Sequence, residues 1–345
     1  MSDVRVMSWN IRTFDVGTLA PDLTNMANII IHEDADIVCV QEIQIGYGVP
    51  NLIDAPISAP QQAVVAALHA ALVANDGASG WLFAFSGANR GTPINGGMRD
   101  AYAFFYKATP QTAGRYPAIA LNAGPGISPP AGQGWYPGRR PGWIQLNLTD
   151  PGAPATNTLI YIYSIHAATN QMAVPNAAQA IRYMPTLVGG QGPGFAGAAF
   201  PLPNIATLVV GDFNYDANAL PAGGGPYANL MVNYSMGIPG NAGAPVGSTY
   251  ALGNPPVGGP PVNKTANLYD NIFHLMPGSQ GVPPAGSLVI AGTANPTVYD
   301  FISVMMPALV AGGLTNNAAF WALYKTQHGH GGVSDHLPVL LDIQF

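Results

Sequence analysis

The chain is built from short apolar segments, most of which end abruptly in polar residues. Segments of about four to eight residues that are rich in β-branched and aromatic side chains are typical of strands. By this criterion strands are predicted over residues 4–9, 36–42, 81–85, 101–107, 143–148, 159–164, 207–210, 268–273, 287–291, 301–305 and 338–343.

Apolar residues at helical spacing separate some of these segments. Leu23, Met26 and Ile30 repeat at the intervals of a helix face and predict a helix over 21–32. Further helices are predicted over 61–75, 176–188 and 307–324, and loops rich in Gly and Pro over 46–60, 109–138, 189–203 and 218–262. The irregular alternation of strands and helices favours an α/β fold with mixed sheets over a regular βαβ wind.

The first and last predicted strands both lead into polar clusters, and the chain shows no internal repeat. We therefore expect the two ends of the chain to meet in one site. This argues against a division into two parts, and residues 1–345 are expected to form a single catalytic domain.

Composition excludes several classes of protein. Charged side chains make up only 8% of the chain, whereas a soluble domain typically carries about 25%. A hydrophobic content of 48% and a net charge of −6 do not fit a disordered chain, which is poor in apolar residues and rich in charge. Gly has no three-residue period, which excludes collagen. No uncharged apolar run reaches the roughly 20 residues of a membrane span.

The N-terminal residues 1–6 have no basic region followed by an apolar stretch, so we expect no cleavable secretory signal in this chain. The expected location is the cytoplasm, or the outside of the cell by a route without a signal. A single cysteine, Cys39, cannot form an intramolecular disulfide, and its apolar neighbours predict that it is buried and inert.

Polar residues gather directly after the predicted strands, which is typical of a site at one edge of a sheet. Carboxylate and amide oxygens suit hard cations such as Mg²⁺, Mn²⁺ or Ca²⁺, and no Cys or multi-His spacing indicates zinc. Two histidines joined to such oxygens fit metal-assisted acid–base chemistry. The clusters are Asn10, Gln41-Glu42, His166, Asp212-Phe213-Asn214 and Ser334-Asp335-His336.

In wording and in order, these clusters resemble the motifs of the endonuclease/exonuclease/phosphatase superfamily, and within it the deoxyribonuclease I type. Together with their flanking strands they span residues 5–343. The resemblance implies a four-layered α/β sandwich of two packed mixed β-sheets flanked by helices, here with long Gly/Pro-rich insertions. It also implies a divalent-metal-dependent phosphodiesterase, most simply an endonuclease that hydrolyses DNA.

The resemblance assigns the metal, with Mg²⁺ expected and Mn²⁺ or Ca²⁺ as alternatives, to Glu42 and Asn10. Asp335 is a further metal or phosphate-orienting candidate, and Asp212 is a candidate second metal ligand. Asp212 would also position the phosphate and the attacking water, together with Asn214.

His166 and His336 would be the acid–base pair, and each should have a carboxylate that fixes its tautomer. For His336 we favour Asp270 over Asp300, because the residues before Asp270 also resemble the deoxyribonuclease pattern. For His166 the candidate is Asp100, where the family usually has Glu. Which histidine acts as the base does not follow from the sequence.

Nucleic acid, DNA above all, is the expected substrate partner of a monomeric protein. The phosphate-contacting candidates are Arg12, Arg139, Arg140 and Arg99, since Arg binds phosphate in a bidentate manner. Local charge decides such contacts, so the net charge of −6 does not exclude them.

Two alternatives stay open. The same chemistry would serve a phospholipid, sphingomyelin or inositol-phosphate substrate, although no membrane-binding hairpin is evident and no stable membrane insertion is expected. A non-catalytic binding protein on the same fold is the second alternative, and the intact set of polar clusters argues against it. An active cytoplasmic nuclease would also need restraint, for example by an inhibitor, and the sequence does not identify one.

Overall fold

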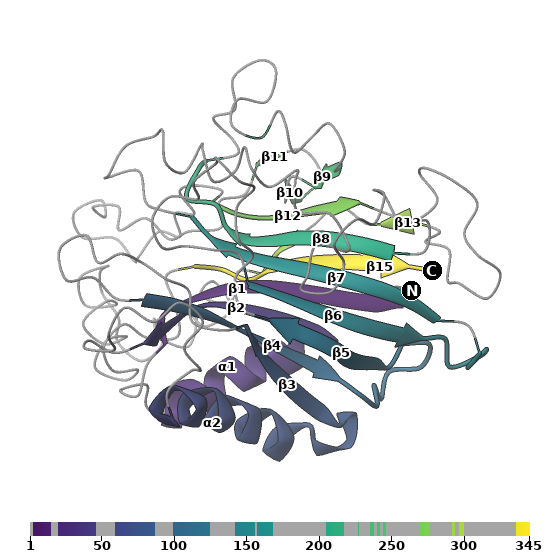
Figure 1. Cartoon of the computed structure of the whole chain (residues 1–345), viewed down its shortest axis with the longest axis horizontal. Helices are drawn as coiled ribbons and strands as arrows, with labels where there is room; N and C mark the ends of the chain where they lie inside the picture. The colour runs from purple at the N-terminus through teal and green to yellow at the C-terminus, as the bar shows by residue number, and fades with distance from the viewer. Residues whose placement is uncertain are drawn as a thin grey trace, which may run out of the picture.

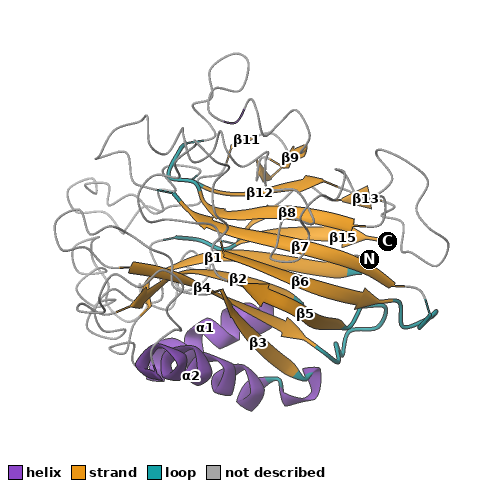
Figure 2. Ribbon diagram, viewed as in Figure 1, coloured by secondary structure: helices purple, strands orange, loops and turns teal. Residues whose placement is uncertain are grey.

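The structure is a computed structural model of the chain. It describes residues 3–14, 20–45, 59–86, 99–124, 142–155, 157–167, 205–216, 227, 235–237, 240–241, 244–245, 269–275, 292–293, 297–299 and 336–345. Two mixed β-sheets pack face to face, and two helices cover one outer face (Figures 1 and 2). The predicted sandwich of two mixed sheets is confirmed. The helices predicted over 176–188 and 307–324 lie outside the described residues.

The first sheet joins the two described ends of the chain. β1 (Val4–Phe14) runs parallel to β2 (Ile37–Ile45) and antiparallel to β15 (Val339–Gln344), with Val4 opposite Ile343. Asp3 strengthens this junction, because its carboxylate accepts the N–H of Phe345 at 2.7 Å. In spatial order the strands are β13 (Gly292–Thr293), β15 (Val339–Gln344), β1 (Val4–Phe14), β2 (Ile37–Ile45), β4 (Arg99–Lys107) and β3 (Trp81–Ser86), and β14 (Thr297–Val298) also pairs with β15.

The described strands of the second sheet pair antiparallel, except for β7 (Asn157–His166) and β8 (Ile205–Asp212), which run parallel. The strands in order are β5 (Ala118–Gly124), β6 (Gly142–Thr149), β7 (Asn157–His166), β8 (Ile205–Asp212), β12 (Asp270–Leu275) and β9 (Ser235–Gly237). A separate two-stranded piece consists of β10 (Gly240–Asn241) and β11 (Ala244–Pro245).

Two apolar clusters hold these layers together. The first lies between the first sheet and the helices α1 (Ala20–His32) and α2 (Ala59–Asn75), where Leu23, Met26 and Ile30 of α1 face inward as their spacing predicts. A short 3₁₀ helix, η1 (Gly77–Ser79), follows α2. The second cluster fills the space between the two sheets. In Figure 1 both helices therefore lie on the same side of the sandwich.

One predicted loop contains a strand. β5 (Ala118–Gly124) lies within residues 109–138, where Gly and Pro predicted no regular structure. Among the described strands β5 lies at the edge of its sheet and pairs only with β6, and its outward residues Ile119 and Leu121 are more than half exposed. An edge strand with a weak apolar pattern gives little sequence signal, because alternation is clear only where one face is buried and the other is polar.

The inner faces of both sheets change character along their length. Side chains alternate between the two faces of a strand, so every second residue points into the inter-sheet space. These inward positions are apolar at one end of each strand and polar at the other. They are Val4, Val6, Ser8 and Asn10 on β1, Ile160, Ile162, Ser164 and His166 on β7, and Ala206, Leu208, Val210 and Asp212 on β8.

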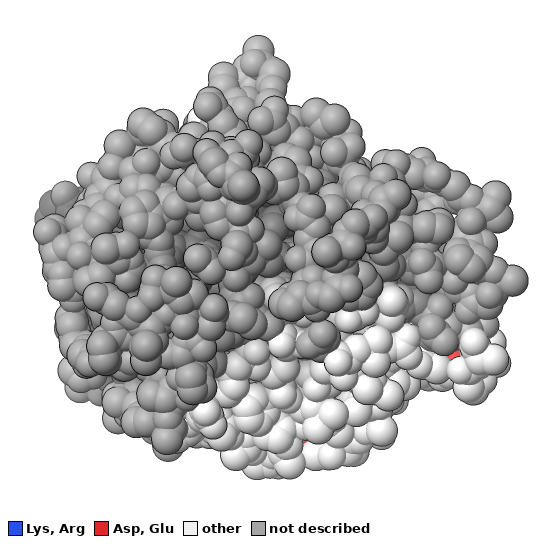
Figure 3. Space-filling view, in the orientation of Figure 1, with Lys and Arg blue, Asp and Glu red and all other residues white. Residues whose placement is uncertain are grey.

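The opposite end of the sandwich holds a buried ion network. Lys107 lies 2.8 Å from Asp34, and Arg115 lies 2.9 Å from Asp36, whose side chain is 1% exposed. The described surface seen in Figure 3 is, by contrast, almost free of charge. The ion pairs of Lys107 and Arg115 and those of the histidines thus lie at opposite ends of the strands.

Gly211 sets the approach of β8 to β7 just before Asp212. Its φ of 130° is a conformation that other residues rarely adopt, and a Cβ atom at this position would overlap the carbonyl oxygen of Ile165. Only glycine fits this position without moving the β7 backbone.

Gly211→Ala should therefore lower the free energy of unfolding by about 3 kcal/mol or more, because both the backbone conformation and the contact are unfavourable. Gly77→Ala is the matched control, since no atom outside its own stretch of backbone lies within 4 Å of the place that its new Cβ atom would take. We expect this substitution to change stability by less than about 1 kcal/mol. Urea denaturation of both variants measures the difference, and equal stabilities would contradict the structural account.

Candidate active site

The strand registers bring distant polar residues to one edge of the sandwich. His166 lies opposite Asp212 in the parallel β7–β8 pair, and Asp270 lies opposite Asp212 in the antiparallel β8–β12 pair. In the first sheet Asn10 lies opposite Gln41. Because both sheets place their polar ends at the same edge, side chains from five strands share one site.

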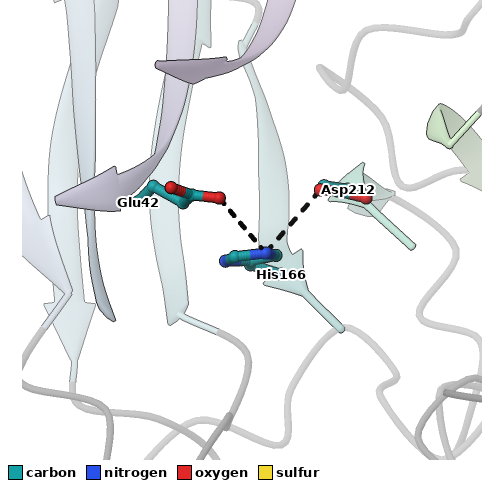
Figure 4. Close-up of side chains that lie close together, drawn as sticks. All are labelled: Glu42, His166 and Asp212. Carbon is teal, nitrogen blue, oxygen red and sulfur yellow. Dashed lines mark ion pairs between the residues drawn. The ribbon is translucent and has the colours of Figure 1, made fainter. Parts of the chain in front are cut away.

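Glu42 faces this site because β2 is irregular there. Gln41 and Glu42 together oppose the single residue Tyr102 of β4, which is a β-bulge. In a regular strand with Gln41 pointing at the second sheet, Glu42 would point toward the helices. Instead Glu42 has a φ of 57°, and its Oε1 lies 3.4 Å from Nε2 of His166 (Figure 4). A left-handed conformation costs a residue with a side chain about 1–2 kcal/mol.

Asp212 is the centre of the site. Its Oδ2 accepts a hydrogen bond from Asn10 Nδ2 at 2.9 Å and lies 3.7 Å from His166 Nε2 and 3.8 Å from His336 Nε2. Its Oδ1 accepts the backbone N–H of Asn214 at 2.7 Å. Each of the two imidazole rings thus directs its own Nε2 atom toward Oδ2 of Asp212.

Asn10 connects two carboxylates through its amide nitrogen. Nδ2 donates to Glu42 Oε1 at 3.1 Å as well as to Asp212 Oδ2. An amide nitrogen is a donor and not a metal ligand. The contacts that the structure shows for Asn10 therefore orient the oxygens of Glu42 and Asp212, which come from different sheets.

His336 is paired with a fully buried carboxylate. Its Nδ1 lies 2.8 Å from Oδ2 of Asp270, whose side chain is 0% exposed. A hydrogen bond from Nδ1–H to a carboxylate fixes the tautomer and leaves Nε2 to exchange a proton. The indole Nε1 of Trp9 donates to the His336 carbonyl at 2.9 Å and holds the backbone in place. Asp300, the alternative partner, lies outside the described residues.

His166 lies between Glu42 and Asp212, as Figure 4 shows. Its backbone N–H donates to the hydroxyl of Tyr102 at 3.1 Å, across the inter-sheet space. The predicted pairing of His166 with Asp100 lies outside the described side chains, although the β4 backbone at Asp100 is described.

The side chain of Asn214 hydrogen-bonds to the backbone that follows β7. It has a φ of 49°, and its Nδ2 donates to the carbonyl of Ala167 at 2.7 Å. The N–H of Ala167 in turn donates to the carbonyl of Asp212 at 2.8 Å. The ends of β7 and β8, which carry His166 and Asp212, are therefore tied together beyond their ladder.

A cluster of aromatic side chains includes Phe213, which follows Asp212 in the chain. Phe213 packs edge-on against Tyr227, and the hydroxyl of Tyr227 donates to the carbonyl of Tyr215 at 2.9 Å. Burial and then the nearby Asp212 carboxylate raise the pKa of Tyr227 well above its ordinary value. The hydroxyl stays protonated, so Tyr227 is a structural donor and not a base.

The charges of the site fit a cation. Asp212 and Asp270 are almost completely buried, and Glu42 is 16% exposed. Ligand atoms of Glu42, His166 and Asp212 lie within 4.8 Å of one another, and so do those of Asp212, Asp270 and His336. A positive charge placed among these carboxylates would offset the repulsion between like charges. Glu42 and Asp212 offer the oxygen donors that a hard divalent ion prefers.

Several predicted residues fall outside this description. Asp335, Arg139 and Arg140 lie outside the described residues, and of Arg12 and Arg99 only the strand backbone is described. Their proposed contacts with metal or phosphate stay predictions.

Two residues that support the site have no role assigned from the sequence. Gln41 and Tyr102 are fully buried, and each makes a hydrogen bond to β7 of the other sheet. Gln41 stood out only as a polar residue beside Glu42, and Tyr102 only as part of an aromatic strand. A polar residue at an inward strand position was the available signal, but its partner depends on how the two sheets are aligned.

Comparison with known proteins gives the family. The profile of the Endonuclease/Exonuclease/phosphatase family matches residues 7–336. The chain belongs to this family, whose members are metal-dependent hydrolases of phosphoester bonds. No curated protein matches the chain in a sequence search. No helix in the described part of the chain has both the length and the hydropathy of a membrane span.

Several solved structures are similar to the chain at low sequence identity. An endonuclease/exonuclease/phosphatase family protein from Leptotrichia buccalis has a TM-score of 0.53 and 14% identity, over 99% of this chain and 100% of that one. A mannosyl-6-phosphatase from Bacteroides thetaiotaomicron has a TM-score of 0.49 and 14% identity, over 99% and 100%. D. rerio TDP2 complexed with single strand DNA product has a TM-score of 0.48 and 12% identity, over 99% of each chain.

Metal binding should be visible without substrate. We expect Mg²⁺ or Mn²⁺ to raise Tm in a saturable manner, since a ligand at 100 times its Kd stabilises a protein by about 2.7 kcal/mol. Glu42→Gln should raise the metal concentration at the midpoint of this titration at least about 10-fold, because it removes a charged ligand. Glu33→Gln, at the other glutamate of the chain, is the control and should leave the midpoint unchanged. A wild-type midpoint in Glu42→Gln would refute this assignment.

Proposed function

We propose that this protein is a divalent-metal-dependent endonuclease that hydrolyses DNA phosphodiester bonds. The observation that carries the proposal is the convergence of two histidines on one carboxylate oxygen, with distances of 3.7 and 3.8 Å from Asp212 Oδ2 to the two Nε2 atoms. Hydrolysis of a diester needs one group to take a proton from water and another to give one to the leaving sugar oxygen. The two imidazoles that meet at Asp212 Oδ2 can supply the proton acceptor and the proton donor.

The two histidines divide these tasks by their surroundings. His336 is assigned to take the proton from water, because the buried carboxylate of Asp270 stabilises the imidazolium that forms. His166 is then assigned to protonate the leaving oxygen. A divalent cation held by Glu42 and Asp212 would neutralise charge on the phosphoryl oxygens. Asn10 keeps those two carboxylates in place.

DNA is proposed as the substrate on the resemblance of the strand-end motifs to the deoxyribonuclease I type. Basic residues are scarce, and the chain has only eight arginines. Half of them are the candidates for phosphate contact, Arg12, Arg99, Arg139 and Arg140. Planar guanidinium groups bind phosphate in a bidentate manner, so a small number placed near the site is enough to orient a backbone.

The proposal is tested by nicking of supercoiled plasmid with Mg²⁺ or Mn²⁺, with and without EDTA. His166→Ala and His336→Ala should each lose about 10²–10⁴-fold in rate, as expected for loss of an acid–base group. His32→Ala is the control, since the side chain of His32 is 68% exposed on α1. Parallel assays with sphingomyelin vesicles and with an inositol phosphate decide between substrates. Turnover of either without nicking rejects the DNA assignment, and no turnover of any favours a binding protein.

Asp270→Asn isolates the role of the buried partner. The substitution preserves shape but offers an amide to Nδ1, which disfavours the required tautomer and the imidazolium of His336. We expect kcat to fall by about 10²–10⁴-fold with little change in KM. Asp342→Asn, at a carboxylate 30% exposed in the opposite half of the sandwich, should leave kcat unchanged. An unaltered kcat in Asp270→Asn would show that the pair has no catalytic role.

A further inference from the structure

A second polar layer lies directly beneath the site residues. Ser8 precedes Asn10 on the inward face of β1, Gln41 precedes Glu42 on β2, and Ser164 precedes His166 on β7. All three side chains are fully buried. Below them the inter-sheet space is apolar.

Gln41 joins this layer across the two sheets. Its Nε2 donates to Oγ of Ser164 at 2.8 Å, and it also contacts Oγ of Ser8 at 3.3 Å and the carbonyl of Cys39 at 3.1 Å. Ser8 and Cys39 belong to the same sheet as Gln41, where the strand ladder already fixes their positions. The contact with Ser164 is the one that links β2 to β7 of the second sheet.

Stability alone does not account for a glutamine at this position. Its Oε1 is buried and accepts no hydrogen bond from the described residues, and an unsatisfied buried acceptor typically costs about 1–3 kcal/mol. An apolar side chain of similar volume would avoid this cost.

The location of Gln41 suggests what the hydrogen bond achieves. Apolar contacts between sheets are non-directional, so they hold the layers together without fixing their offset closely. The oxygens of Glu42 and Asp212 come from different sheets, and cation binding tolerates only small errors in ligand spacing. A directional contact one residue from Glu42 and two residues from His166 constrains that spacing.

We propose that Gln41 is a positioning residue. Through its hydrogen bond to Ser164 it fixes the separation of Glu42 from His166 and Asp212, and so sets the affinity of the site for its divalent cation. The proposal rests on the metal-binding part of the proposed function and not on the identity of the substrate.

The test compares Gln41→Met, which has a similar volume and no donor, with the wild type in a Mn²⁺ titration followed by thermal shift. The midpoint should rise about 10-fold or more, as for loss of a group that orients a metal ligand. The stability of the metal-free protein should stay the same or increase, and kcat should fall while KM for plasmid stays constant. Ile162→Val, one layer lower on β7, is the control: it should lower stability and leave the metal midpoint unchanged.

Ser164→Ala removes the acceptor and should reproduce the shift in midpoint. If both variants act through one hydrogen bond, the double variant should be no worse than the more affected single variant. An unchanged midpoint in Gln41→Met, or additive effects in the double variant, would overturn the proposal.

These outcomes are separate from those of the function itself. A wild-type protein that binds Mn²⁺ but does not nick DNA rejects the endonuclease, and the Gln41→Met midpoint still decides the positioning role. If the wild-type protein nicks DNA and its metal midpoint equals that of Gln41→Met, only the positioning role is rejected. A wild-type protein without any metal-dependent shift overturns the positioning role as well.

Discussion

The packing of two sheets against each other is the interaction on which the site depends. Each sheet alone carries an incomplete set of groups, with Asn10 and Glu42 on one and His166, Asp212 and Asp270 on the other. Apolar contacts between inward side chains hold the sheets together along most of their length. Where those inward positions become polar, the site residues of one sheet face those of the other. Any change that separates the sheets would therefore weaken the site before it unfolds the strands.

Three described hydrogen bonds cross between the sheets at this end: Asn10 to Asp212, Gln41 to Ser164, and the His166 backbone to Tyr102. They differ from the apolar contacts in being directional, so they fix orientation as well as proximity. Two of them involve no group that could touch a substrate phosphate. By the proposed positioning role, the chemistry at the surface would depend on polar pairs buried one layer below it.

Much of the architecture follows from the sequence, because period-two alternation and strand-end polarity are local properties. His166 and Asp212 could be placed at strand ends on that basis alone. Asn10 was predicted to follow a strand over residues 4–9, and this was wrong, because β1 continues past it to Phe14. Sequence spacing could not distinguish Asp270 from Asp300, since that choice depends on the register of β12 against β8. Likewise β5 gave little signal, because its outward residues Ile119 and Leu121 are apolar and exposed instead of polar.

The backbone at Glu42 was also beyond prediction. Alternation places this residue on the helix side, and only the bulge opposite Tyr102 turns it inward. A bulge is a property of two strands paired in a particular register, and neither strand reveals it alone.

The left-handed conformation of Glu42 has a consequence for how this protein would respond to selection. Glycine or asparagine adopts such a backbone more readily and would also relieve the crowding of negative charge around Asp212. A search for thermostable variants that ignores activity would therefore favour replacements at Glu42, which by the proposed function would remove a ligand of the divalent cation. With the proposed metal-binding role, stability and activity would be opposed at this position.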